Sequence, residues 1–452
     1  MRVHFIAIGG SIMHNLAIAL AKKGYMVSGS DDHIYEPSRT NLAKEGLLPA
    51  LGWYPETITA DIDAVVLGMH AKADNPELLK AKEMEVRIYS YPEFIYEQTK
   101  EKIRVVIGGS HGKTTITSII MHVLKSIGRD FDYLVGAKLD EFEYMVRLTK
   151  DAPLAIIEGD EYLASPVDQR PKFHLYKPNI ALISGVAWDH VNAFPTFDNY
   201  VEQFRLFIKS IEPKGTLVYN KEDKKLQEIV LEDQSKINKH GYRTPEYTIN
   251  KGITYMHTHI GNIPLQVFGK HNLSNIAAAF TVCEWLGVSR EEFYTEIKQF
   301  KGASRRLEYV ASDNDSVVYQ DFAHTPTKLR ASIHAVKEQF PGKALVAIVE
   351  LHTYSSLNEA YLNEYKGTMQ DAEYPAVFIN KEALKQRNAD TISEDTLKKA
   401  FDQPNLVYFS DIEGIKNYLE KMDPVGKNLL FMSSGNYGGI NLVNFADKFL
   451  LK

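Results

Sequence analysis

The stretch IRVVIGGSHGKTT, residues 103–115, decides the architecture of this chain of 452 residues. An apolar run ends in a glycine-rich turn, and the segment that follows carries apolar residues at helical spacing from Ile116 to Leu124. A strand, a glycine loop and a helix in this order aim backbone N–H groups and the positive end of the helix at a phosphate group. The stretch therefore predicts a P-loop that binds the phosphates of ATP.

Two side chains of this loop carry the expected chemistry. Lys113 is predicted to reach the β- and γ-phosphates, and the hydroxyl of Thr114 is predicted to ligate Mg²⁺. Because Ile107 stands where the standard eight-residue motif has its first glycine, the alternative is a tight strand-to-helix turn with an exposed lysine. The strand, loop and helix that the motif requires are all present, which favours the phosphate site. The residues expected to hold the nucleotide here are Gly109, Ser110, His111, Gly112, Lys113, Thr114 and Thr115.

Two further polar clusters follow apolar strands, at the edge where open α/β sheets bind ligands. The acidic run Glu158–Glu161 comes directly after Leu154–Ile157, and Asp189-His190 comes shortly after Ile180–Ser184. A carboxylate with a nearby imidazole suits a Mg²⁺ ion that is held partly by phosphate. A solvated strand end or helix cap is the alternative for the acidic run, and a structural histidine is the alternative for the imidazole.

On both sides of this region, short apolar runs alternate with helical patterns, which indicates doubly wound, mainly parallel sheets. The strands and the helix expected before it are Val3–Ile8, Ile12–Lys23 (helix), Met26–Ser28 and Ala64–Gly68. The strands expected after it are Val317–Tyr319, Leu345–Val349, Ala376–Ile379 and Leu429–Met432. The predicted fold class is α/β, with a Rossmann-like N-terminal domain (residues 1–101), a central P-loop ATPase domain (102–304) and a Rossmann-like C-terminal domain (305–452).

Bulk properties exclude several classes of protein. The net charge is −6, so no global basic field attracts nucleic acid or an anionic membrane. Cys283 is the single cysteine, which excludes an intrachain disulfide framework and a cysteine-based zinc site. No apolar stretch approaches the roughly 20 residues that a membrane helix needs. We expect a cytoplasmic protein that acts on small molecules without membrane insertion, and composition does not indicate its oligomeric state.

Seven motifs occur along the chain in a characteristic order. They are Ile8-Gly9-Gly10, Gly109–Thr115, Glu158–Glu161, Asp189-His190, Gly269–Asn275, Arg305–Glu308 and Asp321–His324. In this order and spacing they resemble the Mur ligases of peptidoglycan synthesis, almost from one end of the chain to the other. The resemblance implies a UDP-binding first domain, a central ATPase domain, and a C-terminal domain that closes over ATP and brings the amine substrate.

The resemblance also implies roles for single residues around ATP. Asn275 would hydrogen-bond the adenine edge, since an amide can both donate and accept there. Asp321 would bind the ribose hydroxyls, His324 would lie beside the nucleotide, and Arg306 would reach the γ-phosphate. His271 and Asn272 start the same helix as Asn275, with capping as the alternative role for Asn272. The expected catalytic residues are Lys113, Glu158, His190 and Arg306.

Two Mg²⁺ ions are expected, with Thr114, Glu158 and His190 as protein ligands. Several family members carry a carbamylated lysine downstream of the Asp-His pair. Arg205 stands near that position here, and the nearest lysine, Lys209, lies about one helical turn later. We therefore expect no carbamylated lysine, and a second metal site completed by Glu158 and His190.

The N-terminal glycine loop is expected to hold the diphosphate of a UDP-sugar at a helix start. A dinucleotide-binding domain is the competing interpretation, because Asp31 lies where such a domain has the acid that binds ribose. Ser11 and His14 occupy the second and third glycine positions of the dinucleotide fingerprint, which argues against it. The residues expected to contact the UDP-sugar are Gly9, Gly10, Ser11, Asp31, His70 and Asn75.

Two branches of the family fit the chain best. One recycles the tripeptide L-alanyl-γ-D-glutamyl-meso-diaminopimelate by joining it to UDP-N-acetylmuramate, and the other joins L-alanine to the same sugar nucleotide. Residues 168–173 and 433–440 resemble the recycling branch, so we expect the tripeptide as the amine, joined through an acyl phosphate. Residues 350–358 follow neither branch closely. Outside these branches, a folylpolyglutamate-type ligase, which would lack the first domain, and a nonenzymatic nucleotide-dependent binding module stay open.

Overall fold

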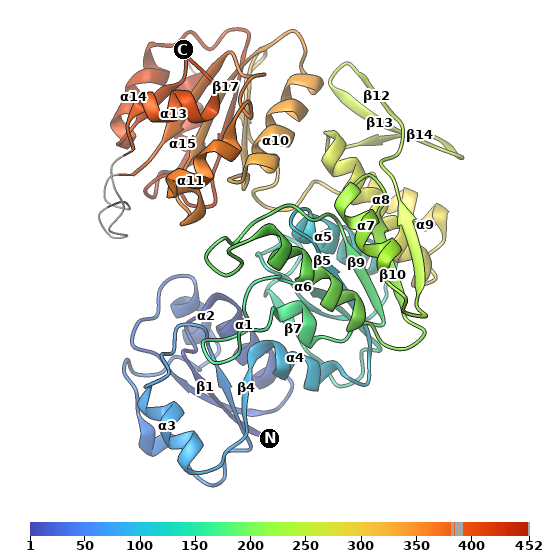
Figure 1. Ribbon diagram of the computed structural model, residues 1–452, viewed down its shortest axis with the longest axis vertical. Helices are drawn as coiled ribbons and strands as arrows, with labels where there is room; N and C mark the ends of the chain where they lie inside the picture. Colours follow the sequence, from blue (N-terminus) through green and yellow to red (C-terminus); the bar gives the residue numbers. More distant parts are fainter. Residues whose placement is uncertain (381–383, 385–391, 451–452) are drawn as a thin grey trace. The chain divides into compact units, whose positions relative to one another are not determined.

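The computed structural model describes residues 1–380, 384 and 392–450, which form mixed α/β structure (Figure 1). The chain divides into two compact units. The first consists of Met1–Trp188, Pro195–Arg243 and Ala278–Phe293, and the second of Asp189–Phe194, Thr244–Ala277 and Tyr294–Lys452. The expected boundaries at residues 101 and 304 stay a prediction. None of the helices in the described part of the chain is long and apolar enough to cross a membrane.

The first sheet of unit 1 has four parallel strands in the order β2-β1-β3-β4. Its strands are β1 (Arg2–Ile6), β2 (Met26–Ser30), β3 (Ala64–Leu67) and β4 (Ile88–Ser90). Strand β1 is shorter than the expected Val3–Ile8 because Ala7 has φ +65°, which takes the backbone out of the extended region. The helical segments connecting or following these strands are α1 (Ser11–Lys22), α2 (Ser38–Lys44), η1 (Pro55–Thr57), α3 (Pro76–Glu83) and α4 (Tyr91–Thr99).

The second sheet of unit 1 has seven strands in the order β11-β10-β9-β5-β8-β6-β7, and only the β6–β7 pair is antiparallel (Figure 1). Its strands are β5 (Ile103–Gly108), β6 (Asp132–Leu134), β7 (Val146–Arg147), β8 (Leu154–Glu158), β9 (Ile180–Ile183), β10 (Thr216–Asn220) and β11 (Asn238–Tyr242). The helical segments in this part of the chain are α5 (Lys113–Ser126), η2 (Lys172–Leu175), α6 (Phe197–Lys209) and α7 (Lys224–Glu232). The expected strand–loop–helix unit around the P-loop is therefore present.

Unit 2 contains a small antiparallel sheet and a larger, mainly parallel one. The small sheet consists of β12 (Tyr247–Asn250), β13 (Ile253–Thr258) and β14 (Gly261–Leu265). The large sheet has the order β15-β16-β20-β17-β18-β19, with only β15–β16 antiparallel. Its strands are β15 (Glu308–Ser312), β16 (Val317–Asp321), β17 (Ala344–Glu350), β18 (Tyr374–Phe378), β19 (Val407–Phe409) and β20 (Lys427–Met432).

Helices α8 and α9 each contain residues of both units. The helical segments are α8 (Lys270–Trp285), α9 (Arg290–Ile297), α10 (Pro326–Gln339), η3 (Ser355–Leu357), α11 (Glu359–Leu362), η4 (Asn363–Tyr365), α13 (Glu394–Phe401), α14 (Ile412–Lys421) and α15 (Leu442–Leu450). Along β17, Leu345, Ala347 and Val349 enter one apolar core, while Val346 and Ile348 enter another. Because successive strand residues point to opposite faces, both faces of this sheet are buried, as a doubly wound α/β fold requires. The predicted fold class is confirmed.

A buried ion pair joins the start of the seven-stranded sheet to strand β6. The Lys102 Nζ lies 2.5 Å from Asp132 Oδ2 and donates to the Thr149 carbonyl at 2.9 Å. The Asp132 side chain is fully buried, and its other oxygen accepts from the Thr149 backbone N–H at 2.9 Å. Removing one partner of such a pair leaves a buried charge without compensation.

Asp132→Ala should therefore lower the free energy of unfolding by about 3–5 kcal/mol. Glu83→Ala is the matched control, since it breaks an exposed pair in which Glu83 lies 3.0 Å from Lys80 Nζ, and should change stability by about 0.5 kcal/mol or less. Urea unfolding followed by circular dichroism measures both variants. Equal, small effects of the two substitutions would contradict the assignment of Asp132 as a buried counter-ion.

Candidate active site

The glycines of the P-loop are needed for its shape. Gly109 and Gly112 have φ values of +126° and +77°, a region that glycine enters without steric cost. A Cβ atom at Gly109 would lie 2.1 Å from the Ser184 hydroxyl and 2.8 Å from the Ser184 backbone nitrogen. The loop is thus pressed against the end of β9, and no larger residue fits at this point.

Hydrogen bonds hold the rest of the loop in place. The Ser110 N–H donates to the Gly185 carbonyl at 3.1 Å, and the Ser110 hydroxyl accepts from the Ala187 N–H at 2.8 Å. The Tyr200 hydroxyl lies 3.0 Å from the same Ser110 oxygen. No side chain of the described residues caps the start of α5 at Gly112, so its first N–H groups remain available to an anion.

Lys113 extends from the first turn of α5 back across the loop. Its Nζ donates to the Gly109 carbonyl at 2.7 Å and to Glu161 Oε2 at 2.6 Å. Burial opposes the charge of this ammonium, but the carboxylates of Glu161 and Asp160 outweigh burial and raise the pKa of Lys113. The lysine is therefore a fixed, protonated cation beside the loop. The sequence indicated both residues but not their direct contact.

Thr114, in the first turn of α5, lies beside Glu158 at the carboxyl end of β8. The Thr114 hydroxyl donates to Glu158 Oε1 at 2.8 Å, and Glu158 Oε2 accepts from the Gly136 N–H at 2.7 Å. Both side chains are buried. A hydroxyl oxygen and a carboxylate oxygen are hard ligands of the type that Mg²⁺ takes in nucleotide sites. The donor set fits the expected metal, and Gly136 is a neighbour that sequence reasoning missed.

A second, half-buried ion pair involves Asp160 of the acidic run. The Lys172 Nζ lies 2.5 Å from Asp160 Oδ2. Burial would raise the pKa of Asp160, but the Lys172 charge prevails and lowers it. The Tyr200 hydroxyl also approaches Glu161 Oε1, at 3.3 Å. Each carboxylate of this run thus has a defined partner in unit 1, which excludes a merely solvated strand end.

The expected UDP-sugar residues gather around a pocket of about 500 Å³ in unit 1. Among the residues that line it are Gly9, Gly10, Ser11, Asp31 and His70, together with Lys138, which sequence reasoning missed. Asp31 Oδ2 accepts from the Gly9 N–H at 2.7 Å, and burial raises the pKa of this carboxyl.

Asn75 has a different position from the other five UDP-sugar candidates. Its side-chain oxygen accepts from the N–H groups of Glu77 at 3.0 Å and Leu78 at 3.1 Å, which caps α3. It does not belong to the lining of the 500 Å³ pocket. Its prediction as a substrate contact therefore has no local geometric support.

His14 explains why the first loop lacks the third glycine of a dinucleotide fingerprint. Its Nδ1 donates to the Gly10 carbonyl at 2.9 Å, and its Nε2 accepts from the Asn15 amide at 2.9 Å. Burial lowers the pKa of His14, so the ring is neutral and both nitrogens are used. His14 therefore stabilises the Gly9-Gly10 loop through hydrogen bonds, at the position where a dinucleotide-binding fingerprint has a glycine that allows close packing.

Unit 2 groups several of the residues expected at the nucleotide. Asp321 ends β16; its Oδ1 accepts from the Leu307 N–H at 3.3 Å, and its Oδ2 accepts from the Ser332 hydroxyl. The Arg306 guanidinium lies over the Phe322 ring, 4.5 Å from the ring centre. The positive φ values of Arg305 (+56°) and Leu307 (+46°) give this turn a strained shape, which is common at functional sites.

His324 and Asp189 share a charged environment within unit 2. The Lys328 Nζ lies 3.8 Å from Asp189 Oδ2, and the Asp189 Oδ1 accepts from the His190 N–H at 2.8 Å. Burial opposes ionisation of Asp189, but Lys328 and the neighbouring histidines lower its pKa to about 2. Burial first, and then the Lys328 charge, lower the pKa of His324 to about 3. His324 is therefore neutral at physiological pH.

Helix α8 carries the remaining nucleotide candidates. The Asn272 amide donates to the Phe268 carbonyl at 2.9 Å, which ties α8 to the preceding residues; it does not cap the helix, because a cap accepts from backbone N–H groups. Asn275 is buried, and its side chain makes no hydrogen bond with the rest of the described chain. Burial lowers the pKa of His271, against the opposing charge of Asp321. Asn275, unlike Asn272, therefore has side-chain hydrogen-bonding groups open to a ligand.

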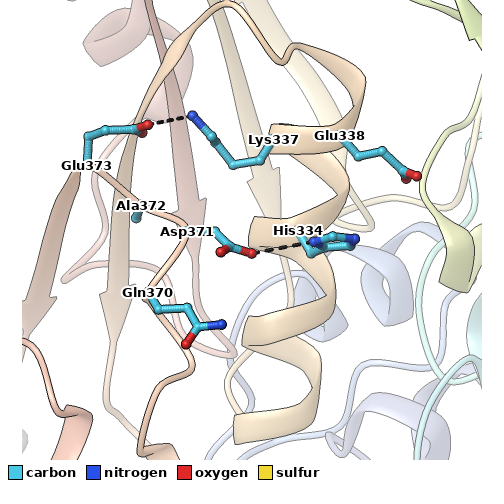
Figure 2. A pocket seen from close by; sticks show the side chains of 7 residues that line it. All are labelled: His334, Lys337, Glu338, Gln370, Asp371, Ala372 and Glu373. Atoms are coloured by element: carbon cyan, nitrogen blue, oxygen red, sulfur yellow. Dashed lines mark hydrogen bonds and ion pairs between the residues drawn. The ribbon is translucent and has the colours of Figure 1, made fainter.

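A larger surface groove, of about 570 Å³, lies elsewhere in unit 2 (Figure 2). It is lined by His334, Lys337, Glu338, Gln370, Asp371, Ala372 and Glu373. The Lys337–Glu373 ion pair, at 2.6 Å, and a His334–Asp371 hydrogen bond, at 3.4 Å, cross it. None of the predicted site residues takes part, so size alone does not identify the active site.

Three family models together match most of the chain. They are described as the Mur ligase family catalytic domain (residues 2–102), the Mur ligase middle domain (107–283) and the Mur ligase glutamate ligase domain (305–435). A UDP-N-acetylmuramate–L-alanine ligase of Caldanaerobacter subterraneus subsp. tengcongensis is 30% identical over 467 residues, which cover 99% of this chain and 97% of that protein.

Solved structures share the fold. A murein peptide ligase from Psychrobacter arcticus has a TM-score of 0.69 at 22% identity, covering 99% of this chain and 98% of that one. A UDP-N-acetylmuramate–alanine ligase from Thermotoga maritima also has a TM-score of 0.69, at 21% identity, covering 100% of this chain and 98% of that one. At this identity the two structures support the fold and do not separate the branches.

The expected tripeptide substrate is corrected by the sequence relatives. Eight of them, at 28–30% identity, all carry the name UDP-N-acetylmuramate–L-alanine ligase. The segment 168–173 that favoured recycling has local roles instead. Arg170 pairs with Asp168 at 2.6 Å and with Glu93 at 2.9 Å, and Phe173 stacks on Phe207 with ring centres 4.4 Å apart. A motif that maintains the fold does not identify the amine.

Lys113→Ala should raise the dissociation constant of ATP by about 10- to 100-fold, because a charge-assisted hydrogen bond contributes about 1.5–3 kcal/mol. Lys125→Ala is the matched control, since this exposed lysine lies on the same helix and donates to the Glu141 carbonyl at 2.6 Å. Isothermal titration calorimetry with ATP and Mg²⁺ measures both. Unchanged affinity in Lys113→Ala would contradict the P-loop assignment.

Stability should depend on His324 below neutral pH. The unfolded imidazole, with a pKa of 6.5, takes up a proton as the pH falls, whereas the folded one does not until about pH 3, so acid favours unfolding. Lowering the pH from 7 to 5 should cost the wild type about 2 kcal/mol through this group. Chemical unfolding at both pH values should show a smaller loss for His324→Gln, with the exposed His334→Gln as control. An equal loss in all three proteins would refute the buried neutral state.

Proposed function

Because the chain belongs to the Mur ligase family, we propose that it joins the carboxylate of UDP-N-acetylmuramate to the amine of L-alanine. It is an ATP-dependent acid–amino-acid ligase, and this class replaces the nonenzymatic nucleotide-binding module as an interpretation. The observation that carries the choice of substrates is the shared name of eight relatives, one of which aligns over 99% of this chain.

The proposed reaction has two steps. The sugar carboxylate attacks the γ-phosphorus of ATP, which releases ADP and leaves an acyl phosphate. The neutral amine of L-alanine then attacks the acyl carbon, and the tetrahedral intermediate loses one amine proton and expels inorganic phosphate to leave an amide. Phosphoryl transfer needs positioning and charge neutralisation more than covalent help from the protein.

Unit 1 supplies the phosphate-binding part of this proposal. The uncapped N–H groups of α5 and the Lys113 ammonium would hold the phosphates, while Glu161 fixes the lysine at 2.6 Å. Thr114 and Glu158 would hold Mg²⁺, which would neutralise charge on the phosphates. His190 remains a proposed third metal ligand, and it belongs to the segment Asp189–Phe194 of unit 2.

Unit 2 supplies the proposed nucleotide contacts. Asn275 offers a buried amide for adenine, and Asp321 offers a carboxylate at a strand end for the ribose hydroxyls. The Arg306 guanidinium, held over Phe322, would stabilise charge on the transferred phosphoryl group. His324 is proposed to lie beside the nucleotide as a neutral imidazole.

The N-terminal pocket is the proposed site for the UDP-sugar. Gly10 precedes α1, whose start no side chain caps among the described residues, so its N–H groups suit a diphosphate. The exposed Lys138 adds a positive charge to the lining. The volume of about 500 Å³ is in the range of small-molecule sites.

Phosphate release from ATP tests the function directly. With Mg²⁺ and UDP-N-acetylmuramate present, L-alanine should stimulate release, and the tripeptide L-alanyl-γ-D-glutamyl-meso-diaminopimelate should leave it near the amine-free background. The product should be UDP-N-acetylmuramoyl-L-alanine by mass spectrometry. Stimulation by the tripeptide alone would overturn the proposed substrate, and no stimulation by either amine would overturn the proposed reaction.

A further inference from the structure

Glu350 is a buried carboxylate that the proposed reaction does not yet use. It is the last residue of β17, one of the two central strands of the six-stranded sheet in unit 2. Only 3% of its surface is exposed. It follows Val346 and Ile348 on the sheet face that packs into an apolar core, so its carboxylate lies at the rim of that core.

Only one of its two oxygens is used by the protein. Oε2 accepts from the Tyr437 N–H at 3.0 Å and from the Ser433 hydroxyl. Oε1 accepts no hydrogen bond from any described residue. Oε1 is not among the buried side-chain atoms that lack a partner, so this oxygen is accessible at the strand end and a ligand can donate to it.

The carboxylate also lacks a cation. Within the described ranges 1–380, 384 and 392–450, no lysine, arginine or histidine forms an ion pair with Glu350. The nearby Arg305 guanidinium donates instead to the carbonyls of Ser433, at 3.0 Å, and Gly435. By contrast, the Glu373 carboxylate in the surface groove is paired with Lys337 at 2.6 Å (Figure 2). A buried charge without a partner is rare in folded proteins, and a ligand is one source of the missing partner.

The position of Glu350 in the sheet is one at which ligands bind. It lies at the carboxyl end of parallel strands, the edge at which open α/β sheets bind ligands. A Cβ atom at Gly435 would lie 2.7 Å from Glu350 Oε2 and 3.2 Å from the His352 ring. Glycine at this point therefore keeps a side chain away from the carboxylate.

We propose that Glu350 binds the ammonium group of the incoming amino acid as it enters, and thereby selects and positions the amine substrate before the amine loses the proton that it must give up to attack. The assignment rests on the proposed ligase function, which requires an amino acid to enter with its amine near the reacting carboxylate. An ammonium offers three donors and one positive charge, which match the unused oxygen and the missing cation. A metal cation would match the charge as well, and the experiment separates the two.

Glu350→Gln is the test substitution, because the amide has the same shape and its oxygen can still accept from Ser433 and Tyr437. Loss of the charge should raise the KM for L-alanine by about 10- to 100-fold, since a hydrogen bond to a charged group contributes about 1.5–3 kcal/mol. The KM values for ATP and UDP-N-acetylmuramate should stay near those of the wild type. Glu373→Gln is the matched control, since it removes a paired, exposed carboxylate near the opposite edge of the same sheet.

Thermal unfolding provides a second readout that needs no substrate. If the charge of Glu350 serves a ligand, Glu350→Gln should melt near the temperature of the wild type, because the charge forms no ion pair with a described residue and the amide oxygen keeps the Ser433 and Tyr437 hydrogen bonds. If the charge only holds the 433–437 loop, the variant should melt lower and its KM for L-alanine should change no more than the other two KM values. That pattern would overturn the proposal.

The outcomes also separate this proposal from the proposed function. The wild type is assayed first, and failure to use any amine would refute the ligase function before the variant is made. If the wild type is active and Glu350→Gln instead needs more Mg²⁺ at unchanged KM for L-alanine, the carboxylate binds a metal and the ammonium assignment is wrong. A selective rise in the KM for the amine supports it.

Discussion

The register of β5 between β8 and β9 is the constraint on which the catalytic region of unit 1 depends. Ile107 is paired with Glu158 on one side, and Gly108 with Ile183 on the other. Because parallel strands end at the same edge, this register brings the P-loop, the acidic run and the end of β9 to one place. A shift by one residue would reverse the faces of the strand and separate Thr114 from Glu158.

Charge compensation then determines what each group at that edge can do. Lys113 is held protonated by Glu161, and Asp160 is held ionised by Lys172, so both ion pairs exist before any nucleotide binds. Preformed charges of this kind need little reorganisation when phosphates arrive. Glu350 in unit 2 differs, because its carboxylate forms no ion pair with a described residue. This missing cation is the reason to propose a cationic ligand.

Sequence reasoning worked where the signal is local. The strand, loop and helix around Gly109 follow from apolar periodicity and glycine positions, and the structure contains all three. The contacts that complete the site join residues far apart in sequence, such as Glu158 with Gly136 and Ser110 with Tyr200. No short pattern encodes them, because they depend on how strands are ordered in the sheet. The sequence pattern also does not predict the positive φ of Ala7, which ends β1 earlier than expected.

The misassigned amine shows a physical limit of motif matching. Residues 168–173 and 433–440 suggested one branch, yet Phe173 stacks in the core and Tyr437 donates to the carbonyls of Ile348 and Met432. Such residues recur because packing and hydrogen bonds require them, whichever amine is used. Substrate choice depends instead on unpaired groups facing the ligand. In unit 2 this criterion favours Glu350, because its Oε1 makes no hydrogen bond with the described chain. It does not favour the neighbouring residues 433–440, although these match a family motif more closely.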